Sequence, residues 1–441
     1  MTRTSKSRAA ILGACGLALL AGGAVPPAAA EPLEIRITQG AEKALPIAIV
    51  PFDAGGASLP ENVAEVIRTD LARSGRFAPM PFADLPSHPT DIAQVNYKDW
   101  RVVGMDNLVI GRITSGGDGN YTVEFRLIDT ITGRQLAGYQ IPTSAANLRL
   151  TAHSISDLIF EALLKIKGAF ATRIAYVTVE KRDAKTRISK LQIADSDGYG
   201  ARTILESQQP LMSPAWSPDG NQLAYVSFED QNSAIYIQDI RTGQRERVMS
   251  GSGINSSPAW SPDGGRLAIT LSRDGNPEIY LLDIASKRLT RITNNEAIDT
   301  EPAWAPDGQS LVFTSDRGGG PQIYRVAAGG GTPQRLTFNM GNYNARASFS
   351  PNGKLLVMVN GGSGGYRIAV LDLTTGSHQV VTNATLDESP SFAPNGSMIM
   401  YATMGARGTE LAATSVDGRV KQRLALQVGE VREPAWGPYR K

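Results

Sequence analysis

Cysteine is almost missing from this chain of 441 residues, in which Cys15 is the single example. Disulfides and cysteine-based metal centres are therefore excluded as sources of stability, which must come from packing. Histidine is nearly as scarce: His88, His153 and His378 have neither a cysteine nor a nearby carboxylate at the spacing of metal ligands. We expect all three histidines at the surface, and we expect no metal and no other cofactor.

An excess of charge of one sign is also missing. The chain has 44 Lys and Arg against 42 Asp and Glu, and without Arg3, Lys6 and Arg8 at the N-terminus 41 basic residues face 42 acidic ones. Nucleic acids and anionic membrane surfaces are bound through a basic field, so neither is expected as a partner. After the N-terminal segment, no apolar run is long enough to cross a bilayer, so direct membrane insertion is not expected either.

The first 30 residues have the organisation of a secretory signal peptide. Their basic residues precede the apolar run AAILGACGLALLAGGAV, and small residues ending in Ala28-x-Ala30 follow it. We predict a signal peptide over residues 1–30, cleaved after Ala30, and an exported product. The letters LGAC resemble a lipoprotein processing site that would acylate Cys15, but the apolar run before Cys15 is short and continues past it, which favours ordinary cleavage.

In place of these missing features the chain has a repeat. Residues 213–220 read SPAWSPDG, residues 257–264 repeat the letters, and variants follow near 301, 345 and 389 before a shortened EPAWGP at 433. The aromatic residues of the six copies are 44, 44, 45, 43 and 44 residues apart: Trp216, Trp260, Trp304, Phe349, Phe392 and Trp436. A period of about 40–45 residues with short strands between Gly-rich turns is typical of propeller blades of four strands.

Each copy predicts a strand through the aromatic residue, a type I turn at the SPDG letters, and three further strands. The two ends of the repeat are complementary. From Arg173 the chain supplies the second, third and fourth strands of a blade without a first, and EPAWGPYRK supplies a first strand and stops. We therefore predict a six-bladed β-propeller over residues 171–437, closed by the C-terminal strand, with the aromatic residues packed between neighbouring blades.

Residues 43–168 differ from the repeat and predict a small α/β domain with a mixed sheet. KALPIAIVPF is typical of a buried strand, and a helix follows that begins with Ser58 and Glu61 as a capping box and stops at Gly75. Two later segments indicate strands with a hairpin near Thr132–Gly133. A last helix, ending at Gly168, is predicted by an apolar stripe of Ala152, Ile155, Leu158, Ile159, Leu163 and Ile166. The fold class is thus multidomain, α/β followed by all-β.

Residues 31–42, which precede this domain, alternate polar and apolar side chains in EPLEIRITQG. A strand at a free N-terminus can pair on its own domain or add to the sheet of a partner. We predict a partner-binding segment here.

Catalytic motifs are hard to find. GGSGG at 361–365 matches the G-x-S-x-G pattern of a nucleophile elbow around Ser363, but it lies between two expected strands of a blade rather than between a strand and a helix. Carboxylates are plentiful, so a propeller enzyme that acts on cell-wall or envelope polysaccharide stays as the alternative hypothesis.

The residues three and four positions before each motif aromatic should ring one mouth of the propeller channel, because they belong to the loops that lead into the innermost strands. They are Ser213, Ser257, Glu301, Arg346, Ser389 and Glu433, preceded by Met212, Ser256, Thr300, Ala345, Glu388 and Arg432. The set mixes acidic and basic side chains. We interpret it as a rim that binds a helix or loop of a partner, with a solvated rim that neutralises its own charges as the alternative.

From the end of the signal peptide onward, the sequence resembles the TolB family of the Tol–Pal system of Gram-negative bacteria. The resemblance rests on PIAIVPF and DLARSGRF, the junction IKGAFATRIAYV, the stretch DGYGARTILESQQPLMSPAWSPDG, and the motifs DTEPAWAPD, LDESPSFAPNG and PAWGPY. It implies a non-enzymatic periplasmic adaptor, monomeric within a multiprotein complex, that supports outer-membrane integrity and constriction during cell division.

The resemblance also implies where partners bind. The family's propeller binds the lipoprotein Pal at the channel mouth, which bacteriocin translocation domains also use; the matching residues here are Met212, Ser213, Asn255, Ser257, Thr300, Glu301, Arg346, Glu388, Arg432 and Glu433. The family's N-terminal segment contacts the inner-membrane protein TolA, and its place is taken here by Glu31, Leu33, Ile35, Arg36 and Ile37. Ile254 departs from the family, some members of which have a histidine there, and this departure would change part of the contact.

Overall fold

The computed structural model describes residues 34–39, 44–183, 186–362, 364–406, 408–425 and 429–440, with the backbone alone for 34–39 and 425. From Pro32 to Lys441 the chain forms one compact unit. The predicted signal peptide with Cys15, the N-terminal residues Glu31 and Leu33, and Ser363 lie outside the described residues. Within the described ranges, no helix combines the length and the apolar character needed to cross a membrane.

The α/β domain is built on a mixed sheet with the strand order β3-β2-β4-β5-β6. Strand β2 lies parallel to β3 and β4, whereas β5 lies antiparallel to β4 and β6. The elements are β2 (Leu45–Ile49), α1 (Val63–Arg73), β3 (Phe77–Pro79), α2 (Tyr97–Val102), β4 (Asn107–Gly117), β5 (Asn120–Asp129), β6 (Gln135–Ser144) and α3 (Leu148–Leu164), with short 3-10 helices at Phe82–Asp84, Ile92–Gln94 and Ala145–Asn147. The predicted mixed sheet and the hairpin between β5 and β6 are confirmed.

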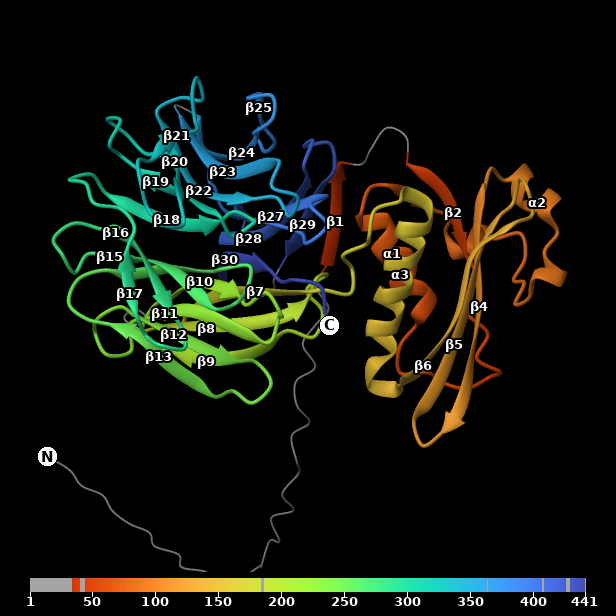
Figure 1. Ribbon diagram of the computed structural model, residues 1–441. Coiled ribbons are helices and arrows are strands. Elements are labelled where there is room, and N and C mark those ends of the chain that lie inside the picture. The colour runs from red at the N-terminus through yellow and green to blue at the C-terminus, as the bar shows by residue number, and fades with distance from the viewer. Residues whose placement is uncertain are drawn as a thin grey trace, which may run out of the picture. The chain divides into compact units, whose positions relative to one another are not determined.

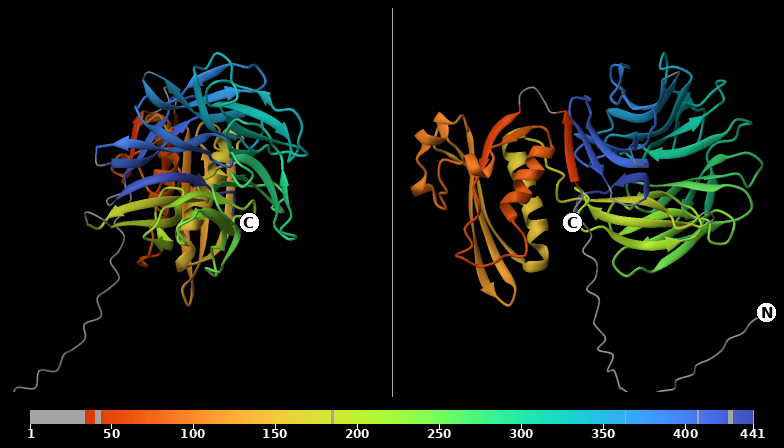
Figure 2. Two further views of the ribbon diagram at one scale, coloured as in Figure 1. Left: turned by 90° about the vertical axis from the view of Figure 1, so that its left-hand side faces the viewer. Right: turned by 180° about the vertical axis from the view of Figure 1, so that it is seen from behind.

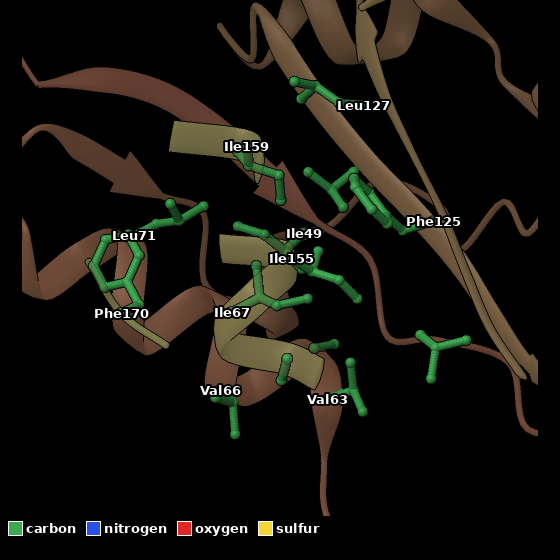
Figure 3. Packing of buried hydrophobic residues seen from close by; sticks show 14 of the residues in the cluster. Ile49, Val63, Val66, Ile67, Leu71, Phe125, Leu127, Ile155, Ile159 and Phe170 are labelled. Atoms are coloured by element: carbon green, nitrogen blue, oxygen red, sulfur yellow. The ribbon is translucent and has the colours of Figure 1, made fainter. Parts of the chain in front are cut away.

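Helices α1 and α3 cover one face of this sheet, as Figure 2 shows from two sides. Their apolar faces meet residues of the strands in one buried cluster, to which Ile49, Ile67, Phe125 and Ile155 contribute fully buried side chains (Figure 3). Burial of each such side chain is worth about 1.5–3 kcal/mol relative to leaving it in water. This cluster fixes both helices on the sheet.

Helix α1 begins later than predicted. Its N-cap is Asn62, whose side chain accepts a hydrogen bond from the Glu65 backbone N–H at 3.1 Å. The predicted capping box of Ser58 and Glu61 is wrong. Pro60 explains the difference, because the residue before a proline is biased toward extended backbone and a helix cannot start directly after Ser58.

The C-terminal ends of the helices agree with the prediction in one case and differ in the other. The chain leaves α1 through Gly75 with φ 65°, as predicted. Helix α3 ends at Leu164, before the predicted Gly168, because Lys165 takes a left-handed conformation at φ 59°. Ile166 therefore lies beyond the helix and is 41% exposed, so its place in the buried stripe is wrong.

After this domain, the described residues form the six antiparallel blades of a β-propeller (Figure 1). The first blade consists of β30 (Glu430–Trp436), β7 (Arg173–Lys181), β8 (Arg187–Asp195) and β9 (Arg202–Ser207). The second and third are β10 (Leu211–Trp216), β11 (Gln222–Ser227), β12 (Ala234–Asp239), β13 (Arg245–Ser250) and β14 (Asn255–Trp260), β15 (Arg266–Leu271), β16 (Glu278–Asp283), β17 (Leu289–Arg291). The fourth is β18 (Asp299–Trp304), β19 (Ser310–Ser315), β20 (Gln322–Ala327) and β21 (Gln334–Arg335). The last two are β22 (Tyr343–Phe349), β23 (Leu355–Gly362), β24 (Gly365–Asp372), β25 (His378–Val380) and β26 (Asp387–Phe392), β27 (Met398–Gly405), β28 (Gly408–Ser415), β29 (Lys421–Ala425).

The ring is closed by the C-terminal strand, as predicted. Strand β30 pairs antiparallel with β7, with Val431 opposite Thr178 and Trp436 opposite Ile174. The last strand of the chain is thereby the innermost strand of the first blade. Closure packs each innermost strand against the innermost strands of the two neighbouring blades, so no blade in the ring lacks a neighbour.

The tryptophans of the repeat join neighbouring blades, which confirms their predicted place. The indole N–H of Trp216 donates to the Ala435 carbonyl at 3.1 Å, that of Trp260 to the Ala215 carbonyl at 3.1 Å, and that of Trp304 to the Ala259 carbonyl at 3.2 Å. Each bond reaches back by one blade, to the alanine before the preceding motif aromatic. A buried indole needs such a partner, and the bond sets the spacing between blades as well as their packing.

The N-terminal segment pairs with the propeller. Strand β1 (Glu34–Gln39) lies antiparallel to β29 as a fifth strand of the last blade, with Ile35 opposite Leu424, Arg36 opposite Arg423 and Ile37 opposite Gln422. Of the two predicted alternatives, the described backbone shows pairing within the same chain, although on the propeller rather than on the α/β domain.

Candidate functional site

The innermost strand of every blade carries the same irregularity three residues before its aromatic residue. The register to the second strand shifts there, between Met212 and Ala215 in β10 and at the equivalent places in the other innermost strands. The residue concerned has a left-handed backbone with φ between 52° and 56°: Ser213, Ser257, Glu301, Arg346, Ser389 and Glu433. This conformation is uncommon without glycine and costs on the order of 1–3 kcal/mol, so its repetition marks a constraint that the whole ring shares.

These six residues, which we call the channel ring, lie where two cavities meet. All six line a cavity of about 440 Å³, together with the prolines and alanines that follow them. Five of them also line a second cavity of about 500 Å³, which extends among Met212, Ile254 and Thr300. The channel ring therefore forms the floor of a mouth on one side and the entrance to the propeller channel on the other.

A cluster of charges crosses the channel ring. The Arg346 guanidinium donates to the Ser389 hydroxyl at 2.8 Å, and it lies 3.3 Å from a Glu433 oxygen and 3.4 Å from a Glu301 oxygen. The two carboxylates also bind backbone groups of the ring: Glu301 accepts the Arg346 N–H at 2.9 Å, and Glu433 accepts the Ser213 N–H. The left-handed backbone thus turns N–H groups toward carboxylates of other blades.

The charge of Arg346 is secured by its neighbours. Burial opposes the charged form, but the carboxylates of Glu433, Glu301 and Glu388 raise the pKa of the guanidinium above its usual value. Two of these carboxylates, those of Glu301 and Glu433, bind backbone N–H groups as well as the guanidinium, so the cluster presents fixed donors and acceptors at the floor of the mouth. Such an arrangement is suited to recognising a polar side chain of a partner.

The loops around the mouth are held by buried polar side chains at the start of the innermost strands. The Asn255 amide donates to the carbonyls of Ser233 at 2.9 Å and Gly251 at 3.1 Å. In the fourth blade, Asp299 at the start of β18 accepts from Arg317, which follows β19 of the same blade, at 2.6 Å. Asn255 is buried, so a role in partner binding would be indirect, through the loop conformation that its hydrogen bonds maintain. This role stays a prediction.

An apolar rim surrounds the polar channel ring, and most of it was missed from the sequence. Six large apolar side chains on the loops and strand ends of the mouth are 40% to 62% exposed: Met212, Ile254, Ile298, Phe338, Tyr366 and Met404. The connections into the innermost strands and those between second and third strands meet at the same end of an antiparallel blade, so all six belong to one face. Exposed apolar groups around a polar centre mark a surface for another macromolecule.

The other predicted site residues divide into two groups. Met212 and Thr300 line the mouth cavity, whereas the half-buried Glu388 faces Arg346 and the exposed Arg432 binds Glu430 at 2.7 Å. We predicted these positions in loops, and this is wrong: they lie inside the innermost strands, because the strands continue through the register shift. The role of these residues in partner binding stays a prediction.

One of the three histidines contradicts the prediction. His88 and His378 are exposed, as expected. His153 is fully buried, and its Nδ1 lies 2.6 Å from an oxygen of Asp70. The partner comes from another helix, so sequence spacing carried no signal for this pair.

Three described glycines of the GGSGG motif, Gly361, Gly362 and Gly365, belong to two paired strands. Strands β23 and β24 pair up to Gly362 opposite Gly365, so the segment turns from strand to strand. A nucleophile elbow requires a helix after the turn. The described residues that follow the motif form strand β24, so the helix that a nucleophile elbow requires is not present there.

Fold and site together define a class of protein in which a six-bladed propeller with a polar channel mouth follows a small α/β domain. Comparison with known families gives a match to the TolB amino-terminal domain over residues 33–136 and to the TolB beta propeller domain over residues 160–440. The chain belongs to the TolB family, which confirms the resemblance seen in the sequence.

Named relatives match along nearly the whole chain. The Tol-Pal system protein TolB of Thioalkalivibrio sulfidiphilus is 55% identical over 418 residues, which cover 94% of this chain and 96% of the relative. That of Nitrosococcus oceani is 56% identical over 424 residues, with 96% and 97% covered. The crystal structure of TolB from Acinetobacter baumannii matches with a TM-score of 0.86 at 42% identity, covering 92% of this chain and all of that one.

Proposed function

We propose that this chain is a non-enzymatic periplasmic adaptor of the Tol–Pal system. It binds the lipoprotein Pal at the channel mouth and TolA through its N-terminal segment, residues 31–42. By joining the two partners it supports outer-membrane integrity and constriction during cell division. Bacteriocin translocation domains compete for the same mouth.

The observation that carries this proposal is the mouth itself, in which an apolar rim surrounds a charged ring. Ile254 and Ile298 offer apolar area to a partner, while Arg346 and Glu301 offer charges of both signs below them. Protein interfaces combine a desolvated apolar region with a few polar contacts that fix orientation. The mouth has both features, and the relatives of this chain are named Tol-Pal system proteins.

The N-terminal segment is proposed as the second site because it already behaves as an added strand. Backbone pairing of β1 with β29 uses one edge of β1, and no other described strand pairs with its second edge, which a strand of a partner can use. We expect deletion of residues 31–40 to abolish TolA binding and to leave Pal binding intact. Loss of both interactions in that deletion would contradict a two-site adaptor.

The test of the mouth is a calorimetric titration of the mature chain with the soluble domain of Pal from the same organism. Ile254→Asp and Ile298→Asp place a charge on the rim without touching the core, because both side chains are nearly half exposed. We expect each variant to weaken binding by about tenfold or more, which corresponds to about 1.4 kcal/mol.

The matched control is Ile131→Asp, which adds the same charge at an exposed isoleucine of the α/β domain. It should bind like the wild type, and circular dichroism should show the same fold for all variants. Wild-type affinity in both rim variants would move the Pal site away from the mouth.

A further inference from the structure

A second polar cluster lies outside the mouth, where helices α1 and α3 contact the loop after β8 of the propeller. His153 of α3 is fully buried there. Its Nδ1 lies 2.6 Å from Asp70 of α1, and its Nε2 lies 3.7 Å from Asp197 of the propeller loop. The imidazole thus stands between two carboxylates that belong to different parts of the fold.

Two arginines complete the cluster. Arg73 of α1 binds Asp70 at 3.0 Å and donates to the Ser196 hydroxyl at 2.9 Å. Arg149 of α3 binds Asp197 at 2.5 Å and Glu61, just before α1, at 3.1 Å. Three carboxylates therefore face two guanidinium groups, and a protonated His153 balances the charge. Buried charges are tolerated when they are paired in this way.

A metal ion fits this cluster poorly, although Asp70, His153 and Asp197 are close enough to suggest one. The two carboxylates face opposite nitrogens of the ring, so an ion on either nitrogen would meet one carboxylate at most. Arg73 and Arg149 already occupy these carboxylates and would repel a cation. A proton on the imidazole is the better occupant.

Asp157, one turn further along α3, holds the connection between the two domains. Its oxygens accept the backbone N–H groups of Phe170 at 2.7 Å and Ala171 at 3.2 Å, which lie in the linker from α3 to β7. A Cβ on Gly168 would lie 2.3 Å from the same carboxylate, so the linker packs directly on it. Asp157 is thus a second titratable group at the joint.

We propose that His153 and Asp157 form a proton-operated latch, which holds the α/β domain on the propeller at mildly acidic pH and loosens this joint as the pH rises. The proposal concerns the joint and does not depend on the partner-binding roles. Loss of the proton from His153 leaves Asp70 and Asp197 with less positive charge than they need. The joint then contains a buried, incompletely compensated charge.

Both groups act in the same direction. Burial opposes protonation of His153, but Asp70 and Asp197 raise its pKa above 6.5, while Arg73 lowers it. Its stabilising contribution is therefore complete below about pH 6.5 and is lost as the pH rises through the higher value in the folded chain. Burial raises the pKa of Asp157 from 3.8 to about 6, against the two backbone hydrogen bonds, so its stabilising contribution is complete below about pH 3.8 and is lost as the pH rises to about 6.

The test measures the distance between the domains as a function of pH. The mature chain has no cysteine, so Lys98→Cys in the α/β domain and Gln244→Cys in the propeller, both exposed, carry two spin labels. We expect one narrow distance distribution at about pH 5.5 and a broader or longer one at about pH 8.5. Identical wild-type distributions at both values would overturn the proposal.

His153→Gln, with a neutral side chain, should lose the narrowing at low pH, whereas His88→Gln at an exposed histidine should behave like the wild type. A His153→Gln chain that keeps the full pH response would contradict the latch. Because a buried substitution can prevent folding, the wild-type imidazole is also titrated by NMR, where only three histidines give signals. We expect the titration midpoint of His153 to lie above about 6.5. Each pH unit by which the midpoint exceeds this value corresponds to a tenfold change in the equilibrium of the joint. A midpoint below about 6.5 would overturn the proposal.

Discussion

At the scale of single residues, the channel ring is built from backbone conformations that its side chains do not favour. Serine, glutamate and arginine have no general preference for a left-handed backbone, yet all six ring residues adopt it. The ring keeps these conformations because carboxylates of other blades bind the N–H groups that the bulges expose, as in Ser213 and Arg346. Local strain is balanced by contacts across the channel.

Ser257 tests this strain most simply, because its side chain makes only a weak contact with the Ser256 hydroxyl at 3.5 Å. We expect Ser257→Gly to be neutral or stabilising by up to ~1 kcal/mol, and Ser257→Val to destabilise by about 1–2 kcal/mol, since a β-branched residue tolerates φ 52° poorly. Urea unfolding measures both.

Its control is the neighbouring strand residue. Ser256→Gly should destabilise by about 0.5–1 kcal/mol, because glycine has no advantage in regular strand backbone. The strain account would be contradicted if Ser257→Gly lost as much stability as Ser256→Gly.

Arg346 supports the ring through its charge. Arg346→Met leaves Glu301 and Glu433 without their cation at a site where the arginine side chain is only 29% exposed, and we expect a loss of about 2 kcal/mol in the free energy of unfolding. Adding Glu433→Gln should restore part of this loss. Arg432→Met removes the exposed ion pair with Glu430 within β30 and should change stability by less than about 0.5 kcal/mol.

Equal losses in the Arg346 and Arg432 variants would show that the channel cluster has no special role. A double-mutant cycle of Arg346 with Glu433 would then give no coupling energy.

At the scale of elements, the two terminal strands have different importance. Strand β30 pairs with β7 and buries Val431 completely, so it is an interior element of the ring. Among the described strands, β1 pairs with β29 alone, at the outer edge of the last blade.

We therefore expect truncation before Glu430 to abolish cooperative unfolding, because it opens the ring and exposes the edge of β7. Deletion of residues 34–39 should leave the propeller transition in place, with a small shift. Calorimetric scans compare the two chains, and a truncated chain that unfolds like the deletion would contradict the role of β30 in closure.

The elements also show what the sequence could and could not predict. The blades were predictable because each of them is local in sequence and repeats the same turn, and closure followed from the complementary ends of the repeat. The start of α1 was placed too early because Ser58 and Asn62 are both acceptable caps and only the backbone before Pro60 decides between them.

The site was predicted less completely. Position three before each aromatic residue was correctly placed at the mouth, yet its left-handed backbone was not, since no local pattern encodes it. His153 was misplaced because its partners Asp70 and Asp197 are brought to it by tertiary packing. The apolar rim was largely missed because single exposed residues such as Ile298 and Phe338 form a surface only when the blades are arranged around an axis.

At the scale of the whole molecule, the buried cluster around His153 predicts how stability depends on pH. His153 and Asp157, whose pKa values are raised, both favour the folded chain at lower pH. Asp70 acts oppositely: burial raises its pKa, but His153 and Arg73 lower it overall, so its contribution is lost only as the pH falls below about 3.8.

The free energy of unfolding should therefore be largest near pH 4, decline up to about pH 6 as Asp157 ionises, and decline again above about pH 6.5 as His153 loses its proton. The decline above about pH 6.5 should amount to about 1.4 kcal/mol for each pH unit by which the pKa of His153 in the folded chain exceeds its value in the unfolded chain. Urea unfolding across this range measures it, and His153→Gln should flatten the decline. A wild-type maximum above about pH 8 would contradict the assignment.

The central claim is that the channel mouth is the surface that meets the partner in the outer membrane. Hydrogen–deuterium exchange of the mature chain, with and without the soluble domain of Pal, tests it most directly. We predict slower exchange in the loops that lead into β14 and β18, next to Ile254 and Ile298, and no change in the hairpin of β5 and β6. Protection confined to the α/β domain or to the outer strands, with the mouth unchanged, would contradict the account.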